Sequence, residues 1–151
     1  MEGSEEGTVA EPVYGQPGDK LIVIVDDDDS VRELLEFVVK KEGFKVDTCK
    51  DGEEALRRIP ELKADLIILD MMLPRYGGFE ILRELQNGEA AGVPIVIITG
   101  RYSDKSTKDM IKAESNVKEF LEKPVRPQVL AMLLHKILQT RPAGPAARGG
   151  W

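Results

Sequence analysis

The middle of the chain reads ADLIILDMMLPRYGGFEIL over residues 64–82. At its centre four aliphatic residues, 66–69, run directly into the carboxylate of Asp70. An unbroken aliphatic run of this length is typical of a parallel strand that is buried on both faces of its sheet. Ligands of such sheets bind beyond the carboxyl ends of the strands. This stretch therefore predicts an α/β fold and makes Asp70 the first candidate for a functional residue.

The same pattern recurs on both sides of this stretch. Residues 21–25 and 95–98 are also unbroken runs of Leu, Ile and Val, whereas residues 44–49 and 117–121 are weaker strand candidates. Helical segments are predicted after the strands, at residues 31–39, 55–62, 79–85 and 129–138, with a more polar one at 103–114. Five such βα units with right-handed crossovers predict a doubly wound parallel sheet with helices on both faces.

The start of the first helix offers two candidate caps. Ser30 and Glu33 have the spacing of a capping box, in which each side chain bonds to the backbone of the other residue. Asp29 is the alternative, because a carboxylate also accepts hydrogen bonds from the first turn of a helix. Gly43 is expected to end this helix.

The composition suits one globular domain, with 151 residues and a net charge of −6. The acidic balance argues against a nucleic-acid surface, and no apolar run is long enough to cross a membrane. A single cysteine, Cys49, excludes an internal disulfide, and the amino-terminal residues lack the pattern of a signal peptide, so we expect a cytoplasmic protein. Residues 1–19 and 140–151 predict flexible tails around a domain at residues 20–139.

Polar residues follow the predicted strands where each one ends. Asp26 and Asp27 follow the first strand, Asp70 the third, Thr99 the fourth and Lys123 the fifth. Because the carboxyl ends of parallel strands meet at one edge of a sheet, these side chains should converge there. Three adjacent carboxylates repel one another unless a cation neutralises them, and magnesium (Mg²⁺) suits such a site. An Asp beside Mg²⁺ can attack phosphorus, while a hydroxyl and an ammonium share the charge of the phosphoryl oxygens.

The stretches that carry these residues resemble the receiver domains of two-component response regulators. They read LIVIVDDDDSVRELLEF at residues 21–37, ADLIILDMMLPRYGGFEIL at 64–82, IVIITGR at 95–101 and EFLEKPV at 119–125. The resemblance covers roughly residues 20–139. It implies a flavodoxin-like sheet with strand order 2-1-3-4-5.

The resemblance also implies residue roles. Asp70 would accept the phosphoryl group and, with Asp26, Asp27 and the backbone carbonyl of Met72, would hold Mg²⁺. The hydroxyl of Thr99 would bond a phosphoryl oxygen.

Two further roles follow from the family's fifth strand. Lys123 would pair with Asp70 and then with the phosphoryl group, and Phe120 would be the aromatic residue that switches together with Thr99. The peptide bond between Lys123 and Pro124 would be cis.

The function implied is a phosphorelay switch rather than a metabolic enzyme. A sensor histidine kinase or a phosphotransfer protein would phosphorylate it, and it would bind neither nucleic acid nor membrane directly. A downstream protein would read the face formed by residues 103–114, 117–121 and 129–138.

Two alternatives remain open at this point. The first is a receiver-like module that binds partners without phosphorylation, against which the complete set of acids, hydroxyl and ammonium argues. The second is a Mg²⁺-dependent phosphohydrolase with an Asp nucleophile. Such enzymes often carry a second Asp two residues after the nucleophile and a cap insertion, whereas this chain has Met72 there and only short connections.

Overall fold

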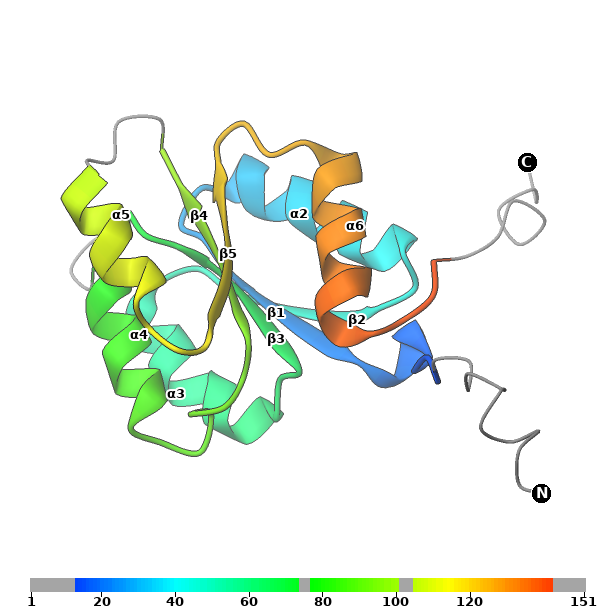
Figure 1. Ribbon diagram of the computed structural model, residues 1–151, viewed down its shortest axis with the longest axis horizontal. Coiled ribbons are helices and arrows are strands. Elements are labelled where there is room, and N and C mark those ends of the chain that lie inside the picture. Colours follow the sequence, from blue (N-terminus) through cyan, green and yellow to red (C-terminus); the bar gives the residue numbers. More distant parts are fainter. Residues whose placement is uncertain (1–12, 74–76, 101–104, 143–151) are drawn as a thin grey trace, which may run out of the picture.

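The structure is a computed structural model that describes residues 13–73, 77–100 and 105–142 (Figure 1). Its elements are, in chain order, the 3-10 helix η1 (Pro17–Asp19), β1 (Leu21–Val25), α2 (Asp29–Lys41), β2 (Lys45–Cys49), α3 (Gly52–Leu62), β3 (Leu66–Asp70), α4 (Gly78–Gln86), β4 (Ile95–Thr99), α5 (Lys105–Lys112), β5 (Val117–Glu122) and α6 (Pro127–Leu138). Every predicted strand and helix is present.

The strands form one sheet in the order β2-β1-β3-β4-β5, and all neighbouring pairs are parallel. This confirms the expected order. β3 and β4 extend one residue beyond their aliphatic runs, so that Asp70 and Thr99 are the last residues of their strands. Both therefore lie at the carboxyl edge of the sheet, held by strand geometry rather than by a loop.

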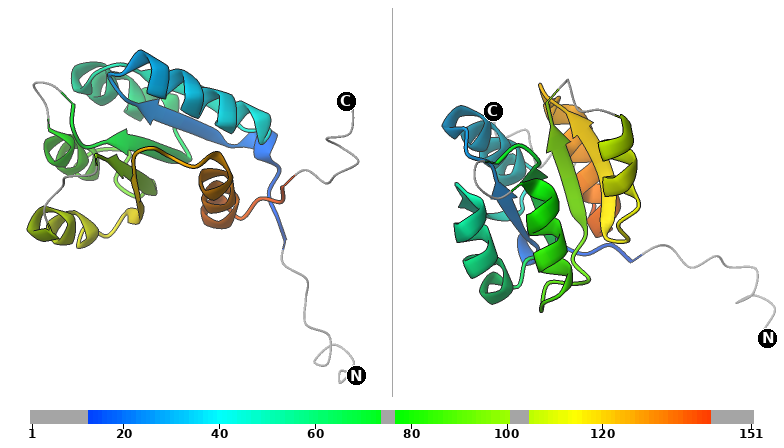
Figure 2. Two further views of the ribbon diagram at one scale, coloured as in Figure 1. Left: turned by 90° about the horizontal axis from the view of Figure 1, so that it is seen from above. Right: turned by 90° about the vertical axis from the view of Figure 1, so that its left-hand side faces the viewer.

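Helices cover both faces of the sheet, with α2 and α6 on one face and α3, α4 and α5 on the other (Figures 1 and 2). Successive residues of each strand point to opposite faces. In β1, Val23 and Val25 pack toward α3 and α4, whereas Ile22 and Ile24 pack toward α2 and α6. Burial on both faces explains why the central strands are continuous aliphatic runs.

The first helix begins at a different cap from either one predicted. Asp28 is the N-cap of α2, and its carboxylate accepts hydrogen bonds from Ser30 N at 2.9 Å, Ser30 Oγ at 2.7 Å and Val31 N at 3.2 Å. The bond from the Ser30 hydroxyl, followed by that from Val31 N–H, holds the pKa of Asp28 below its usual value. The predicted capping box of Ser30 with Glu33 and the alternative cap Asp29 are therefore both wrong.

The fifth strand enters the sheet irregularly. Val117 pairs with Ile95, but the next pair joins Glu119 to Val96, so Lys118 is an extra residue in β5. This bulge adds local twist to β5, the strand that carries Phe120 and is directly followed by Lys123.

The segments that flank the domain meet at the amino ends of the strands. Gly15 N donates to Gln139 O at 2.9 Å, and Gly15 forms a parallel bridge with Thr140. The guanidinium of Arg141 lies 4.7 Å from the ring centre of Tyr14. Figure 1 shows η1 beside the end of α6.

Ordered contacts thus extend past the predicted domain boundaries into parts of both predicted tails. The remainder of those tails, residues 1–12 and 143–151, lies outside the described residues.

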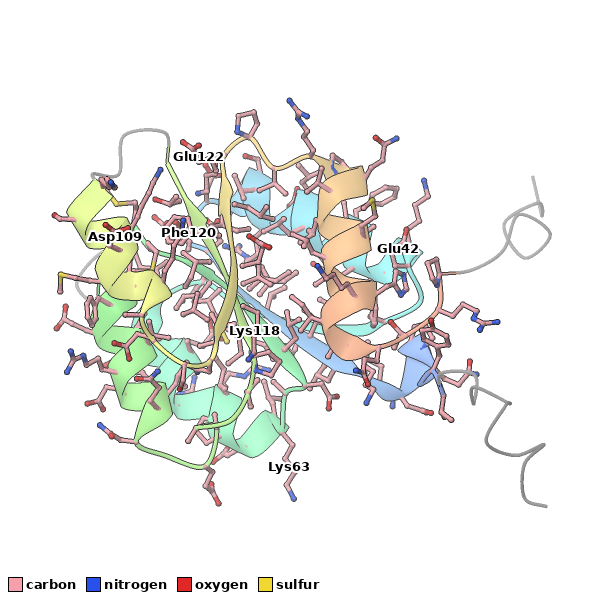
Figure 3. The ribbon with its side chains drawn as sticks, in the orientation of Figure 1. Glu42, Lys63, Asp109, Lys118, Phe120 and Glu122 are labelled. Carbon is pink, nitrogen blue, oxygen red and sulfur yellow. The ribbon has the colours of Figure 1, made fainter. Side chains whose placement is uncertain are left out.

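The single histidine, His135, makes buried contacts near the same amino ends of the strands. His135 Nε2 lies 2.9 Å from Glu42 Oε1, and its Nδ1 lies 2.7 Å from Thr140 Oγ1. The ring also packs on Phe44, with 4.9 Å between ring centres. His135 therefore links the end of α2, where Figure 3 labels Glu42, to the segment after α6.

Among the described residues, no helix has the length and apolar character that crossing a membrane would require.

Candidate phosphoacceptor site

Three carboxylates gather at the carboxyl edge of the sheet. Asp26 and Asp27 directly follow β1, and Asp70 ends β3. One carboxylate oxygen from each lies within 4.8 Å of the other two. Asp26 is 1% exposed and Asp70 is 2% exposed, whereas Asp27 lies on the surface. The predicted convergence of these three acids is present.

Lys123 joins the two buried acids. Its Nζ lies 3.2 Å from Asp26 Oδ2 and 3.4 Å from Asp70 Oδ2. Within the described residues, Asp26 Oδ2 is a buried oxygen that has this ion pair but no aligned hydrogen-bond donor. A buried carboxylate oxygen in that condition can accept a further cationic partner.

The other oxygen of each buried acid is bound to the backbone. Asp28 N donates to Asp26 Oδ1 at 2.9 Å, and Met72 N donates to Asp70 Oδ1 at 3.1 Å. In both acids Oδ1 is fixed by a backbone amide and Oδ2 is turned toward Lys123. Both carboxylates are therefore held in defined orientations by protein contacts.

The electrostatic balance of the site favours a cation. Burial raises the pKa of Asp70, and the neighbouring charge of Asp26 raises it further, against the hydrogen bond from Met72 N–H. Burial lowers the pKa of Lys123, but the charges of Asp70 and Asp26 outweigh that effect and leave this pKa raised. One ammonium beside three carboxylates leaves negative charge uncompensated, so the donor set fits a hard divalent ion with oxygen ligands.

Thr99 and Lys123 meet across β4 and β5. Thr99 is buried at the end of β4, opposite Glu122, and its carbonyl accepts a 2.8 Å hydrogen bond from Lys123 N. The peptide bond between Lys123 and Pro124 is cis, as the resemblance implied. Thr99, at the end of β4, and Lys123, directly after β5, thus lie side by side at the carboxyl edge of the sheet.

Phe120 lies three residues before Lys123, on the side of β5 that meets α5. Figure 3 places Phe120 and Glu122 along β5, beside Asp109 of α5. Lys108 Nζ and Lys112 Nζ lie 5.9 and 5.7 Å from the centre of the Phe120 ring, within cation–π range. The ring is half-buried between the core and these two lysines.

Met72 contributes through its backbone. Its side chain is 70% exposed, while its N–H bonds to Asp70. The predicted metal-binding group, the backbone carbonyl of Met72, is a different group from this N–H, so its role stays a prediction.

Sequence reasoning missed one contact at the site. Arg32, in the first turn of α2, donates from Nη1 to the backbone carbonyl of Asp26 at 2.8 Å. The only indication of this contact in the sequence is an arginine one helical turn after an acidic cluster. An arginine that is simply exposed to solvent would give the same pattern.

Comparison with known proteins gives consistent results. The family described as "Response regulator receiver domain" matches residues 22–135. DNA-binding response regulator MtrA of Mycolicibacterium smegmatis is 36% identical over 126 residues, which are 83% of this chain and 53% of that protein. Alkaline phosphatase synthesis transcriptional regulatory protein PhoP of Bacillus subtilis is 32% identical over 120 residues, 80% of this chain and 49% of that protein. The chain thus spans about half the length of these relatives.

Solved structures agree with this match. Chemotaxis protein CheY4 of Vibrio cholerae superposes with a TM-score of 0.71 at 28% identity, covering 79% of this chain and 98% of that one. A response regulator receiver protein from Pseudomonas putida superposes with a TM-score of 0.72 at 27% identity, covering 82% and 99%. The family match, the strand order and the convergence of three acids with a lysine lead to one conclusion: this chain belongs to the family of response regulator receiver domains.

Proposed function

We propose that Asp70 is the phosphoacceptor of this receiver domain. The observation that carries the proposal is the position of Lys123, whose ammonium lies 3.4 Å from a phosphoacceptor candidate that is 2% exposed. Asp28 and Asp29 are exposed at the start of α2, and within the described residues Lys123 forms its ion pairs with Asp26 and Asp70 instead. Asp26 shares the fixed orientation, the carboxylate cluster and the ammonium. The choice of Asp70 over Asp26 rests on its place at the end of β3, which matches the phosphoacceptor strand that the family resemblance implies.

Asp26, Asp27, Asp70 and the backbone carbonyl of Met72 are the groups that would hold Mg²⁺. When bound, Mg²⁺ neutralises the carboxylates and draws charge from the oxygens of the transferred phosphoryl group. Two observations support this assignment: Asp26 Oδ2 is buried with the ion pair to Lys123 but no aligned hydrogen-bond donor, and the three carboxylates cluster within 4.8 Å. The backbone bonds to Oδ1 of Asp26 and of Asp70 orient these two of the proposed ligands.

In the proposed reaction a carboxylate oxygen of Asp70 attacks phosphorus and forms an acyl phosphate. The donor's bond to phosphorus breaks, and its electron pair leaves with the donor, which for a histidine kinase is an imidazole nitrogen. Because the transition state is loose, holding the reactants in line and neutralising charge provide most of the rate gain. Lys123 and the Thr99 hydroxyl would contact the new phosphoryl oxygens.

The signal is proposed to start at Thr99 and Phe120. Movement of Thr99 toward the phosphoryl group would leave space beside β4, and inward rotation of Phe120 would fill it. Lys108 and Lys112 of α5 cover the ring now, so this rotation would change the surface that α5 and β5 present. We infer that a downstream protein reads the face of α5, β5 and α6.

Family membership supports a signalling switch whose partners include histidine kinases. Two of the relatives are named as DNA-binding or transcriptional regulators, and this chain matches about half of each. We propose that the domain at residues 20–139 does not itself contact DNA, in keeping with the net charge of −6, and that it acts in the cytoplasm.

The test is incubation with acetyl phosphate and Mg²⁺, followed by intact mass measurement. The wild-type chain should gain the mass of one phosphoryl group, labile to base and hydroxylamine, and Asp70→Asn should gain none. Asp28→Asn and Asp29→Asn are matched controls that should still label. Stoichiometric labelling of Asp70→Asn would refute the assignment.

The same experiment separates the alternatives. A wild-type chain that never labels, even with a cognate kinase, would be a receiver-like binding module. Rapid multiple turnover of a small phosphate ester would instead indicate a phosphohydrolase.

A further inference from the structure

Arg32 connects the first turn of α2 to the end of β1. Its side chain is 18% exposed, Nη1 donates to Asp26 O at 2.8 Å, and Nη2 bonds the carboxylate of Asp29. Its own backbone N–H donates to Asp28 O at 2.9 Å. One residue thus contacts three members of the run of four aspartates.

The bond to the Asp26 carbonyl acts on the peptide plane between Asp26 and Asp27. On the other side of Asp26, its N–H donates to Cys49 O of β2 at 3.2 Å. The backbone is therefore held both before and after Asp26, and a rotation of the following peptide would break the bond to Arg32. Asp27 lies on the surface, between this peptide and the helix cap Asp28, so its position depends on these two anchors.

We propose that Arg32 is a positioning residue, which fixes the Asp26–Asp27 peptide so that both carboxylates face one cation. This rests on the proposed Mg²⁺ site. Arg32 contacts the main chain of a ligand residue and not the reacting atoms. A planar guanidinium suits the task because it bonds the carbonyl with one arm and the Asp29 carboxylate with the other.

Charge and positioning predict opposite results for removal of Arg32. A positive group beside the cluster repels an incoming cation, so loss of the charge alone would tighten Mg²⁺ binding. Loss of positioning would weaken binding, because groups that orient metal ligands commonly contribute about 10-fold to 100-fold in affinity. The direction of the change therefore identifies the role.

The experiment is a Mg²⁺ titration followed by amide chemical shifts, without a phosphodonor. We expect Arg32→Gln to raise the Kd about tenfold, at the lower end of that range. Arg32→Lys keeps the positive charge but lacks the two-armed guanidinium, so it should also raise the Kd for Mg²⁺. Lys40→Gln is the matched control, since Lys40 lies on the same helix, pairs with Glu36 at 3.0 Å and is remote from the cluster in sequence. Its Kd should equal that of the wild type.

The outcomes separate this inference from the metal assignment. An Arg32→Gln variant that binds Mg²⁺ as tightly as the wild type, or more tightly, overturns the positioning role. A combined Asp26→Asn, Asp27→Asn variant with unchanged Mg²⁺ affinity overturns the metal site itself. Thermal unfolding of each variant is recorded alongside, and Arg32→Lys supplies the answer if Arg32→Gln does not fold.

Discussion

Lys123 and Asp70 form an ion pair at the edge of the sheet, with 3.4 Å between Nζ and Oδ2. Asp70 is 2% exposed, whereas the lysine side chain keeps 27% of its surface in contact with solvent. The same ammonium reaches Asp26 at 3.2 Å. One partly exposed cation thus compensates two buried anions, and the two partners should respond differently to substitution.

Removal of the ammonium should destabilise the metal-free domain. Lys123→Ala leaves two buried carboxylates without their cation, and we expect the free energy of unfolding to fall by about 1 kcal/mol. This figure is below that of a fully buried pair because solvent screens the lysine. Mg²⁺ should restore more stability to the variant than to the wild type, as measured by urea unfolding with EDTA or with Mg²⁺. Equal gains would show that the cation does not replace the ammonium.

The same lysine should separate phosphorylation from signalling. Lys123→Ala should still accept a phosphoryl group from acetyl phosphate, because Asp70 and the other proposed metal ligands remain. The phosphorylated variant should fail to reproduce the wild-type changes in amide chemical shift around Phe120. Lys123→Arg should not restore them fully, because a guanidinium differs in shape from an ammonium. A normal response in Lys123→Ala would assign the switch to other residues.

Substitution of Asp70, the proposed phosphoacceptor, should have the opposite effect on stability. Because burial and Asp26 raise the pKa of Asp70, the folded state binds its proton more tightly than the unfolded state does. The ionised carboxylate therefore costs stability above its folded pKa, and this cost disappears as the pH falls toward the unfolded value of about 3.9. In EDTA at pH 7, Asp70→Asn should be more stable than the wild type by about 1 kcal/mol. The difference should shrink in unfolding experiments near pH 4.

The cap of α2 can be tested by paired substitutions. Asp28→Ala removes the acceptor of three hydrogen bonds and should lower the Tm by about 4 °C. Glu33→Ala should leave the Tm nearly unchanged, since Asp28 and not a capping box starts the helix. Because the pKa of Asp28 is lowered, its contribution should be complete above the unfolded pKa and lost as the pH falls through the folded one.

Cys49 should be inert in the folded protein. It is 1% exposed at the end of β2, and burial raises the pKa of its thiol to about 11. Thiolate is the reactive form, so a disulfide reagent at pH 8 should label Cys49 only as fast as the domain opens. Labelling in urea should follow the unfolding transition. Rapid labelling of the native chain would place this thiol at the surface.

The strands and the grouping of acids at their carboxyl ends could be predicted from the sequence, because both depend on residue periodicity and strand direction. The aliphatic runs before Asp70 and Thr99 required strands buried on both faces, and parallel strands bring their carboxyl ends together. The grouping of Asp26, Asp27 and Asp70 followed from that geometry alone. The pairing of Lys123 with Asp70 came from the family resemblance.

Other features depended on choices between equivalent groups or on distant contacts. Asp28, Asp29 and Ser30 can each cap a helix, and only the backbone angles decide which one does. The extra residue Lys118 in β5 and the bond from Arg32 to Asp26 leave no periodic signal. The contact of Gly15 with Gln139 joins residues that are far apart in the chain, so no local pattern could indicate it.

That contact between Gly15 and Gln139 brings the segment before the first strand and the segment after the last helix together. The two flanking segments run side by side at the amino ends of the strands, at the edge opposite Asp70. A short linker between residues 13 and 142 should therefore allow circular permutation, with new ends placed in an exposed connection such as residues 87–89. A permuted chain of this kind would keep every strand that builds the proposed phosphoacceptor site, while moving the attachment point for a fused partner to another side of the domain.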